Sequence, residues 1–174
     1  MVKKIIKEIF IGSDHAGFRL KHKINAYLDR HKIPYHDLGN LIFDLNDDYP
    51  DYAAQVARAV VKNKSRGILI CGSAEGVCLA ANKIRGARAV NPDSLIRVKM
   101  AREHLDANIL CLAGGGSRHK QPAVPISKAT KMIAVFLSTS FSHASRHIRR
   151  INKIKKLELA GAGISTAGLR NTSR

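Results

Sequence analysis

Short apolar runs rich in β-branched residues alternate with amphipathic segments along most of this 174-residue chain. Runs of the first kind predict buried strands, and apolar positions at helical spacing predict helices. The expected strands lie at 8–12, 33–39, 68–70, 87–90 and 109–112, and the expected helices at 18–28, 52–62, 77–81, 93–103 and 126–137. Strands that alternate with helices form a parallel sheet covered on both faces. The sequence therefore predicts an α/β sandwich of three layers with a central parallel sheet.

The length corresponds to one ordinary domain, and neither an internal repeat nor a second domain is visible. A basic helical segment is expected at 146–154. From Leu159 the chain turns to Gly, Ala, Ser and Thr, a composition typical of disorder. We therefore expect a folded domain over 1–158 and a disordered tail over 159–174.

Hydropathy and cysteine usage favour a cytoplasmic protein. No apolar run is long enough to span a membrane, and the first residues lack the apolar core of a signal peptide. The three cysteines have no paired spacing, which argues against a disulfide scaffold or a zinc site.

The formal net charge of +17 allows two interpretations. One is a nucleic-acid partner, and the other is a basic surface that suits an acidic small substrate. Aromatic residues make up only 5% of the chain and Trp is absent, so basic residues do not alternate with stacking platforms. This composition argues against nucleic-acid binding as the main function.

The stretch from Gly67 to Lys83 is the strongest candidate for a site. It reads as a buried strand, a turn of small residues from Cys71 to Gly76, and the beginning of a helix. Free backbone N–H groups and the helix dipole would favour an anion at this turn. Cys71 ends the strand, where open α/β sheets place their ligands, and such a thiol can have a lowered pKa. The alternative is an ordinary strand-turn-helix joint with a buried cysteine, since the turn is neither a Walker A loop nor a dinucleotide fingerprint.

Two other turns carry polar side chains. Asp14 and His15 follow the first strand, where Ser13 or Asp14 could alternatively serve as a helix N-cap. The loop 40–51 carries four aspartates, which either bind a metal or form a solvated loop with a helix cap; their spacing is not that of an EF-hand.

Three polar clusters are expected to converge at the carboxyl edge of the sheet. They are Asp14 with His15, Cys71 with Ser73, and His104 with Asn108. Arg146 and Arg150 lie four residues apart, share a helix face and suit a phosphate dianion. A thiol and a histidine are two proton carriers near neutral pH. This inventory fits cofactor-free proton transfer on a phosphorylated small molecule, such as sugar-phosphate isomerisation.

Five motifs together resemble those of the ribose-5-phosphate isomerase B family, which also holds the galactose-6-phosphate isomerase subunits. They occur in family order between about residues 8 and 154, and they are 13–18 (SDHAGF), 48–53 (DYPDYA), 67–73 (GILICGS), 80–83 (AANK) and 102–108 (REHLDAN). The resemblance implies a Rossmann-like sandwich that works as a homodimer or tetramer, with sites at the subunit interface. It implies metal-free conversion of ribose 5-phosphate to ribulose 5-phosphate through a cis-enediolate.

The resemblance also assigns roles to single residues. Cys71 matches the base that moves a proton between C2 and C1, Ser73 its hydroxyl assistant, and His104 the histidine that opens the furanose ring. The matching phosphate ligands are His15, Arg146 and Arg150. Asp14, Asp48 and Tyr49 match contacts to the sugar. The resemblance also leads us to expect Gly72, Gly76 and Asn82 among the substrate-binding positions. The glutamate base of other members would fall near Val77, so the chain resembles the cysteine type.

Four positions depart from the family pattern. Ala74 and Leu105 stand where glycine and asparagine are usual, and Ser142–Ser145 replaces a glycine pair. An arginine usual after the last strand is not in place, and Arg118 is the nearby candidate. Three functions follow for comparison: a pentose-phosphate isomerase, an isomerase of galactose or allose 6-phosphate, and a non-catalytic binder of sugar phosphate or RNA.

Overall fold

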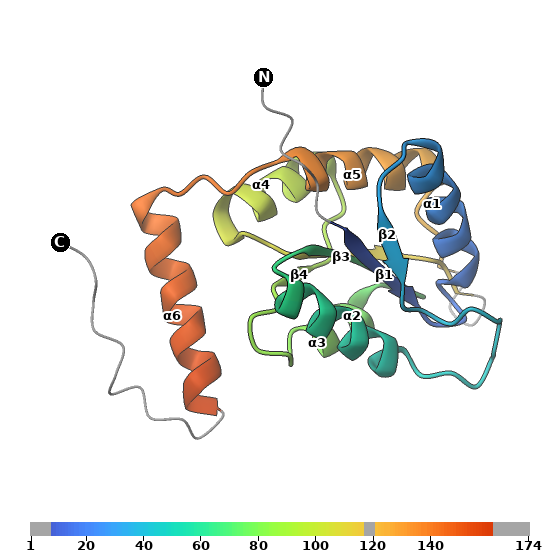
Figure 1. The fold of residues 1–174 in the computed structure, drawn as a ribbon, viewed down its shortest axis with the longest axis horizontal. Helices are drawn as coiled ribbons and strands as arrows, with labels where there is room; N and C mark the ends of the chain where they lie inside the picture. The colour runs from blue at the N-terminus through green and yellow to red at the C-terminus, as the bar shows by residue number, and fades with distance from the viewer. Residues whose placement is uncertain (1–7, 117–120, 162–174) are drawn as a thin grey trace.

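The computed structural model describes residues 8–116 and 121–161. Its centre is a five-stranded, all-parallel sheet with the strand order β2-β1-β3-β5-β4. The strands are β1 (Ile9–Ser13), β2 (Tyr35–Asp37), β3 (Arg66–Cys71), β4 (Ala89–Val90) and β5 (Ile109–Ala113). Helices cover both faces of the sheet (Figure 1). The expected three-layer α/β sandwich is confirmed.

Alternate residues of each strand pack into different layers, as the two-residue period of a strand requires. Ile9 and Ile11 face α1 (Phe18–Arg30), α4 (Leu95–Leu105) and α5 (Ile126–Ser138), whereas Phe10 faces α2 (Tyr49–Asn63) and α3 (Glu75–Ala81). Both faces of the central strands are therefore buried, which explains why β3 and β5 read as continuous apolar runs.

Helix α2 begins three residues before the predicted start. Pro50 occupies the first turn, where its missing N–H forms no helical hydrogen bond in any case. The loop predicted over 40–51 therefore ends at Asp48, which is the N-cap of α2.

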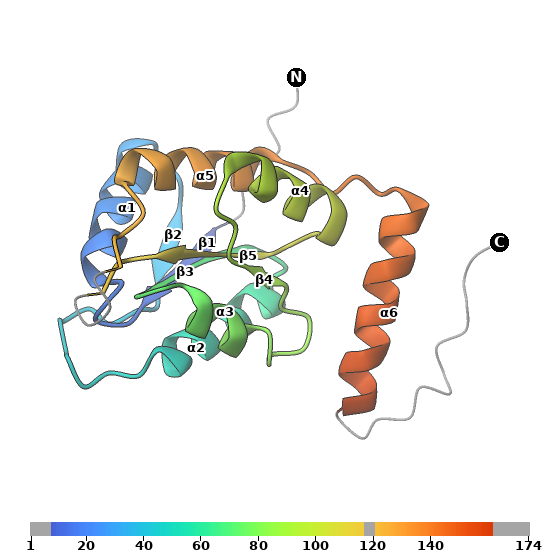
Figure 2. The same ribbon diagram turned by 180° about the vertical axis from the view of Figure 1, so that it is seen from behind.

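Helix α6 (Ser145–Gly161) stands apart from the three layers (Figures 1 and 2). Near its start the Ser142 N–H donates to the Glu103 carbonyl, and near its end Glu158 accepts from the Gly86 N–H at 3.2 Å. The helix continues three residues into the stretch expected to be a tail, and the rest of that stretch lies outside the described residues. Within 8–116 and 121–161, no helix has both the length and the hydropathy needed to cross a membrane.

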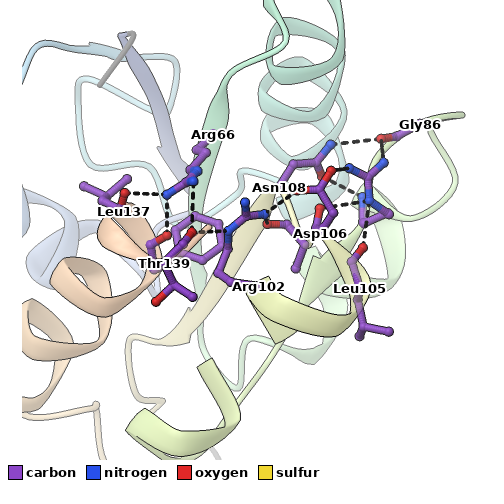
Figure 3. Close-up of polar contacts among 11 residues, drawn as sticks. Arg66, Gly86, Arg102, Leu105, Asp106, Asn108, Leu137 and Thr139 are labelled. Carbon is purple, nitrogen blue, oxygen red and sulfur yellow. Dashed lines mark hydrogen bonds and ion pairs between the residues drawn. The ribbon is translucent and has the colours of Figure 1, made fainter. Parts of the chain in front are cut away.

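Three arginines, Arg66, Arg88 and Arg102, donate to backbone carbonyls at the end of the molecule where the strands begin. Figure 3 labels two of them, Arg66 and Arg102. Arg66 donates to the carbonyls of the last turn of α5 and to Thr139, and Arg102 donates to Thr139 as well. Arg88 donates to the carbonyl and to the carboxylate of Asp106, directly after α4. Burial lowers the pKa of Arg66 to about 10. The arginines thus fix the carboxyl end of α4 and the connection that leads to α6.

Candidate active site

Three loops meet at the carboxyl edge of the sheet and leave little space between them. A Cβ on Gly17 would lie 2.5 Å from the Ile70 carbonyl oxygen. The Gly114 N–H donates to the Cys71 carbonyl at 2.7 Å, and the Gly115 N–H donates to the Gly72 carbonyl at 3.0 Å. The loops after β1, β3 and β5 therefore form one surface around the end of β3.

Cys71 lies at the centre of this surface with 4% of its area exposed. Burial raises the pKa of its thiol, while the backbone N–H groups of Val77, Ala74 and Ser73 act in the opposite direction. The expectation of a lowered pKa is wrong for the ligand-free protein, because desolvation outweighs these hydrogen bonds. The thiol is therefore kept protonated beside three N–H groups that can stabilise its anion.

Ala74 adopts a left-handed conformation at φ 72°, where family members usually have glycine. This conformation costs an L-residue about 1–2 kcal/mol. The Ala74 side chain is completely buried in the core on the α2 and α3 side, which offsets part of that cost. The turn thus keeps the shape that glycine would allow.

Tyr49 reaches the same surface from the first turn of α2. A Cβ on Gly76 would lie 2.8 Å from two carbons of the Tyr49 ring, so only glycine fits there without a shift. Asp48 precedes Tyr49 and is exposed. Ser73 sits between Cys71 and Gly76, and its hydroxyl accepts from the Glu75 N–H at 3.3 Å.

Asp14 and His15 hold the loop after β1. The Asp14 carboxylate accepts from the Gly17 N–H at 2.9 Å, but the N-cap of α1 is Gly17, so the alternative that Ser13 or Asp14 is the N-cap is wrong. The backbone N–H of His15 donates to Asp47 at 2.9 Å, and its ring Nδ1 lies 2.6 Å from the same carboxylate oxygen. This hydrogen bond is the main cause of the raised pKa of His15. Asp47 is thus no solvated loop residue.

His104 and Asn108 do not join this surface, so the expected convergence is wrong for them. Both precede β5, and the Asn108 carbonyl accepts from Gly67 at the beginning of β3. From Gly67 to Cys71 the strand advances four residues, or roughly 13 Å. A helix that connects two parallel strands runs back across the sheet and ends at the edge where the next strand begins. The last turn of α4 therefore places His104 at the amino edge.

The amino edge collects a second polar group around His104. The His104 ring lies 4.3 Å from the His147 ring between centroids, and His147 Nδ1 lies 2.7 Å from the Ser142 hydroxyl. Burial, and then the nearby His104 and arginines, lower the pKa of His147. Arg146 and Arg150 flank His147 on α6 and are exposed. Sequence reasoning missed His147, although its place between the two arginines was a usable signal.

Three further predictions have different outcomes. Both groups of the Asn82 side-chain amide bond the backbone of Ala89, at 2.9 and 2.8 Å, so the Asn82 side chain is engaged in holding β4. Arg118 lies outside the described residues. In the described part of the chain, no three or more His, Cys, Asp or Glu side chains gather in a metal-binding arrangement.

The fold and its carboxyl-edge thiol fall within a known class of α/β proteins. The sequence profile described as Ribose/Galactose Isomerase matches residues 9–154. The chain belongs to this family, as the motifs indicated.

Individual relatives agree with this placement. The probable ribose-5-phosphate isomerase B of Mycoplasma genitalium is 45% identical over 152 residues, which cover 86% of this chain and 95% of that protein. The crystal structure of ribose-5-phosphate isomerase B from that organism, with bound ribulose-5-phosphate, superposes with a TM-score of 0.78 at 43% identity over 87% of this chain and 95% of its own. The structure of ribose-5-phosphate isomerase B from Clostridium thermocellum superposes with a TM-score of 0.80 at 36% identity. The match covers 89% of this chain and 99% of that chain.

Proposed function

We propose that this chain interconverts ribose 5-phosphate and ribulose 5-phosphate through a cis-enediolate, with Cys71 as the base. The relatives' names and the ribulose-5-phosphate bound in the Mycoplasma genitalium enzyme support this substrate. The observation that carries the proposal is the buried Cys71 thiol beside the N–H groups of its turn. Three free cysteines fit a reducing cytoplasm.

We assign the steps as follows. His104 opens the furanose ring, and Cys71 moves the proton between C2 and C1 with help from Ser73. The N–H groups of the 71–77 turn hold the enediolate oxygen, because such donors act most strongly on charge that develops in a buried site. His15 and the two α6 arginines bind the phosphate, whose two negative charges match theirs. Asp14, Asp48 and Tyr49 contact the sugar.

These roles require two copies of the chain, because the residues lie at opposite edges of the sheet. Cys71, Ser73 and His15 follow strands, whereas His104, Arg146 and Arg150 lie at the amino edge. We propose a dimer in which the amino edge of one chain meets the carboxyl edge of its partner. Exposed apolar side chains on α4 and α6 support burial against a second copy: Ile96 (62% exposed), Met100 (45%), Ile148 (41%) and Leu157 (72%).

The direct test measures ribulose 5-phosphate formed from ribose 5-phosphate by the purified protein in the presence of a chelator. We expect turnover that the chelator does not reduce, because proton transfer between thiol and carbon needs no metal. Galactose and allose 6-phosphates serve as comparison substrates, and kcat/KM should be highest for the pentose. A folded protein that turns over no pentose phosphate would contradict the proposal.

The shared site has a separate test in hybrid dimers. Cys71→Ala and His104→Ala chains, carrying different affinity tags, are coexpressed, and the hybrid is purified. Each variant alone should be inactive. In the hybrid one of the two sites keeps both side chains, so we expect about half of the wild-type activity for an isologous dimer. An inactive, folded hybrid would place both residues in a site within one chain.

A further inference from the structure

Asp47 is the buried acid that the proposed reaction leaves without a role. Its side chain is 5% exposed, unlike the neighbouring Asp44 and Asp48, which are exposed. One carboxylate oxygen contacts both the backbone N–H and the Nδ1 of His15, at 2.9 and 2.6 Å. The other accepts from the Asn40 side-chain amide at 2.5 Å. Both oxygens are therefore fixed, and one of them contacts the histidine at two points.

We propose that Asp47 is a positioning residue that orients the His15 imidazole and keeps it cationic for a phosphate group. Because Nδ1 is bound to Asp47, Nε2 is the ring nitrogen left for a ligand. The His15 side chain is 32% exposed, so a ligand can reach it. The choice of phosphate as the ligand rests on the proposed function. The contact between Asp47 and His15 does not, because it is present in the ligand-free protein.

Both acidic side chains around His15 raise the pKa of its imidazole. The hydrogen bond to Asp47, from the loop before α2, raises the pKa of His15 most, burial lowers it, and the charge of Asp14, in the same loop as His15, raises it further. The Phe43 ring meets the imidazole edge-on at 6.5 Å between centroids. Tyr52 on α2 faces Asp47, and burial followed by Asp47 raises the pKa of that phenol. His15 should therefore remain charged at a higher pH than an ordinary histidine, whose pKa is about 6.5.

The decisive variant is Asp47→Asn, which keeps the size and an acceptor oxygen but removes the charge. Asp44→Asn is the matched control, because it removes a charge from the same loop and Asp44 does not contact His15. The pKa of His15 is measured by NMR titration of the ligand-free proteins. We expect a value above the ordinary range in the wild type and the control, and a fall toward about 6.5 in Asp47→Asn. An unchanged His15 pKa in folded Asp47→Asn would overturn the proposal.

Binding of inorganic phosphate, followed on the His15 ring resonances, tests whether the charged imidazole binds phosphate. This test does not rely on turnover. Near pH 7.5 we expect on the order of tenfold weaker binding in Asp47→Asn, with the difference vanishing at low pH, where both imidazoles are protonated. In an active protein the same change appears in KM for ribose 5-phosphate, with kcat little affected. By isothermal titration calorimetry, which needs no His15 resonance, the double variant with His15→Gln should bind phosphate no more weakly than His15→Gln alone. If Asp47→Asn lowers the pKa of His15 but leaves phosphate binding unchanged, the charged imidazole does not bind phosphate. That result would overturn the proposal that Asp47 keeps His15 cationic for a phosphate group.

Discussion

Replacement of Cys71 by alanine is expected to abolish turnover while leaving the protein folded. The variant lacks the proposed base for the C2 proton, and general-base catalysis contributes about a hundredfold to ten-thousandfold. We expect the kcat of Cys71→Ala to fall at least about a hundredfold in the ribose 5-phosphate assay. The small cavity left behind should cost about 1 kcal/mol of unfolding free energy, measurable by urea denaturation.

Cys78→Ala provides the matched control, because Cys78 lies in α3 and has no part in the proposed reaction. That variant should keep most of the wild-type activity. In the wild type, kcat should rise with pH, because burial raises the pKa of Cys71 and the thiolate forms only as the pH approaches that value. A Cys71→Ala protein with a tenth or more of wild-type activity would mean that another group is the base.

Replacement of Lys21 by methionine is expected to destabilise the fold by about 3–5 kcal/mol, the usual effect of breaking a buried ion pair. Lys21 is fully buried, and its ammonium group donates to both carboxylate oxygens of Asp37 and to the Asn40 carbonyl, each at 2.8 Å. Methionine fills the same space but leaves these acceptors without their cation. The measurement is urea denaturation monitored by circular dichroism.

Lys23→Met tests whether the effect belongs to the buried pair. Lys23 is exposed on the same helix, so its replacement should change stability by no more than about 0.5 kcal/mol. If Lys21→Met lowers the free energy of unfolding by less than about 1 kcal/mol, another donor to Asp37 has replaced the lysine. That donor would be solvent or Asn25, which also donates to Asp37. Since Asn40 bonds both Lys21 and Asp47, the variant should also loosen the His15 pairing.

The layers of the fold were predictable from the sequence because each strand carries its own pattern. Ile9, Phe10 and Ile11 are apolar without interruption because both faces of β1 are covered. The two-residue β4 was predicted within 87–90, although its pairing is short. The start of α2 was placed too late, since the Tyr-Pro pair was read as part of the loop. Helix-compatible spacing around 146–154 indicated α6 but could not show that it stands away from the sheet.

The carboxyl-edge part of the candidate site was predictable because Cys71 ends a strand, and Asp14, His15 and Ser73 come within two residues after the end of one. His104 was placed at the wrong edge because it was grouped with the turn at 104–108, which precedes a strand and does not follow one. The pairing of Asp47 with His15 joins residues 32 positions apart. No local pattern encodes such a contact, and in sequence Asp47 cannot be distinguished from the exposed acids beside it.

The side-chain amide of Asn82 caps the backbone of the edge strand β4. Ala89 directs its N–H and carbonyl away from β5, and Asn82 takes both, much as the backbone of one more strand would. Unpaired groups on an edge strand are a template on which chains aggregate. A single side chain therefore ends the growth of the sheet at β4, which favours a chain that stays in solution when it is crowded with copies of itself.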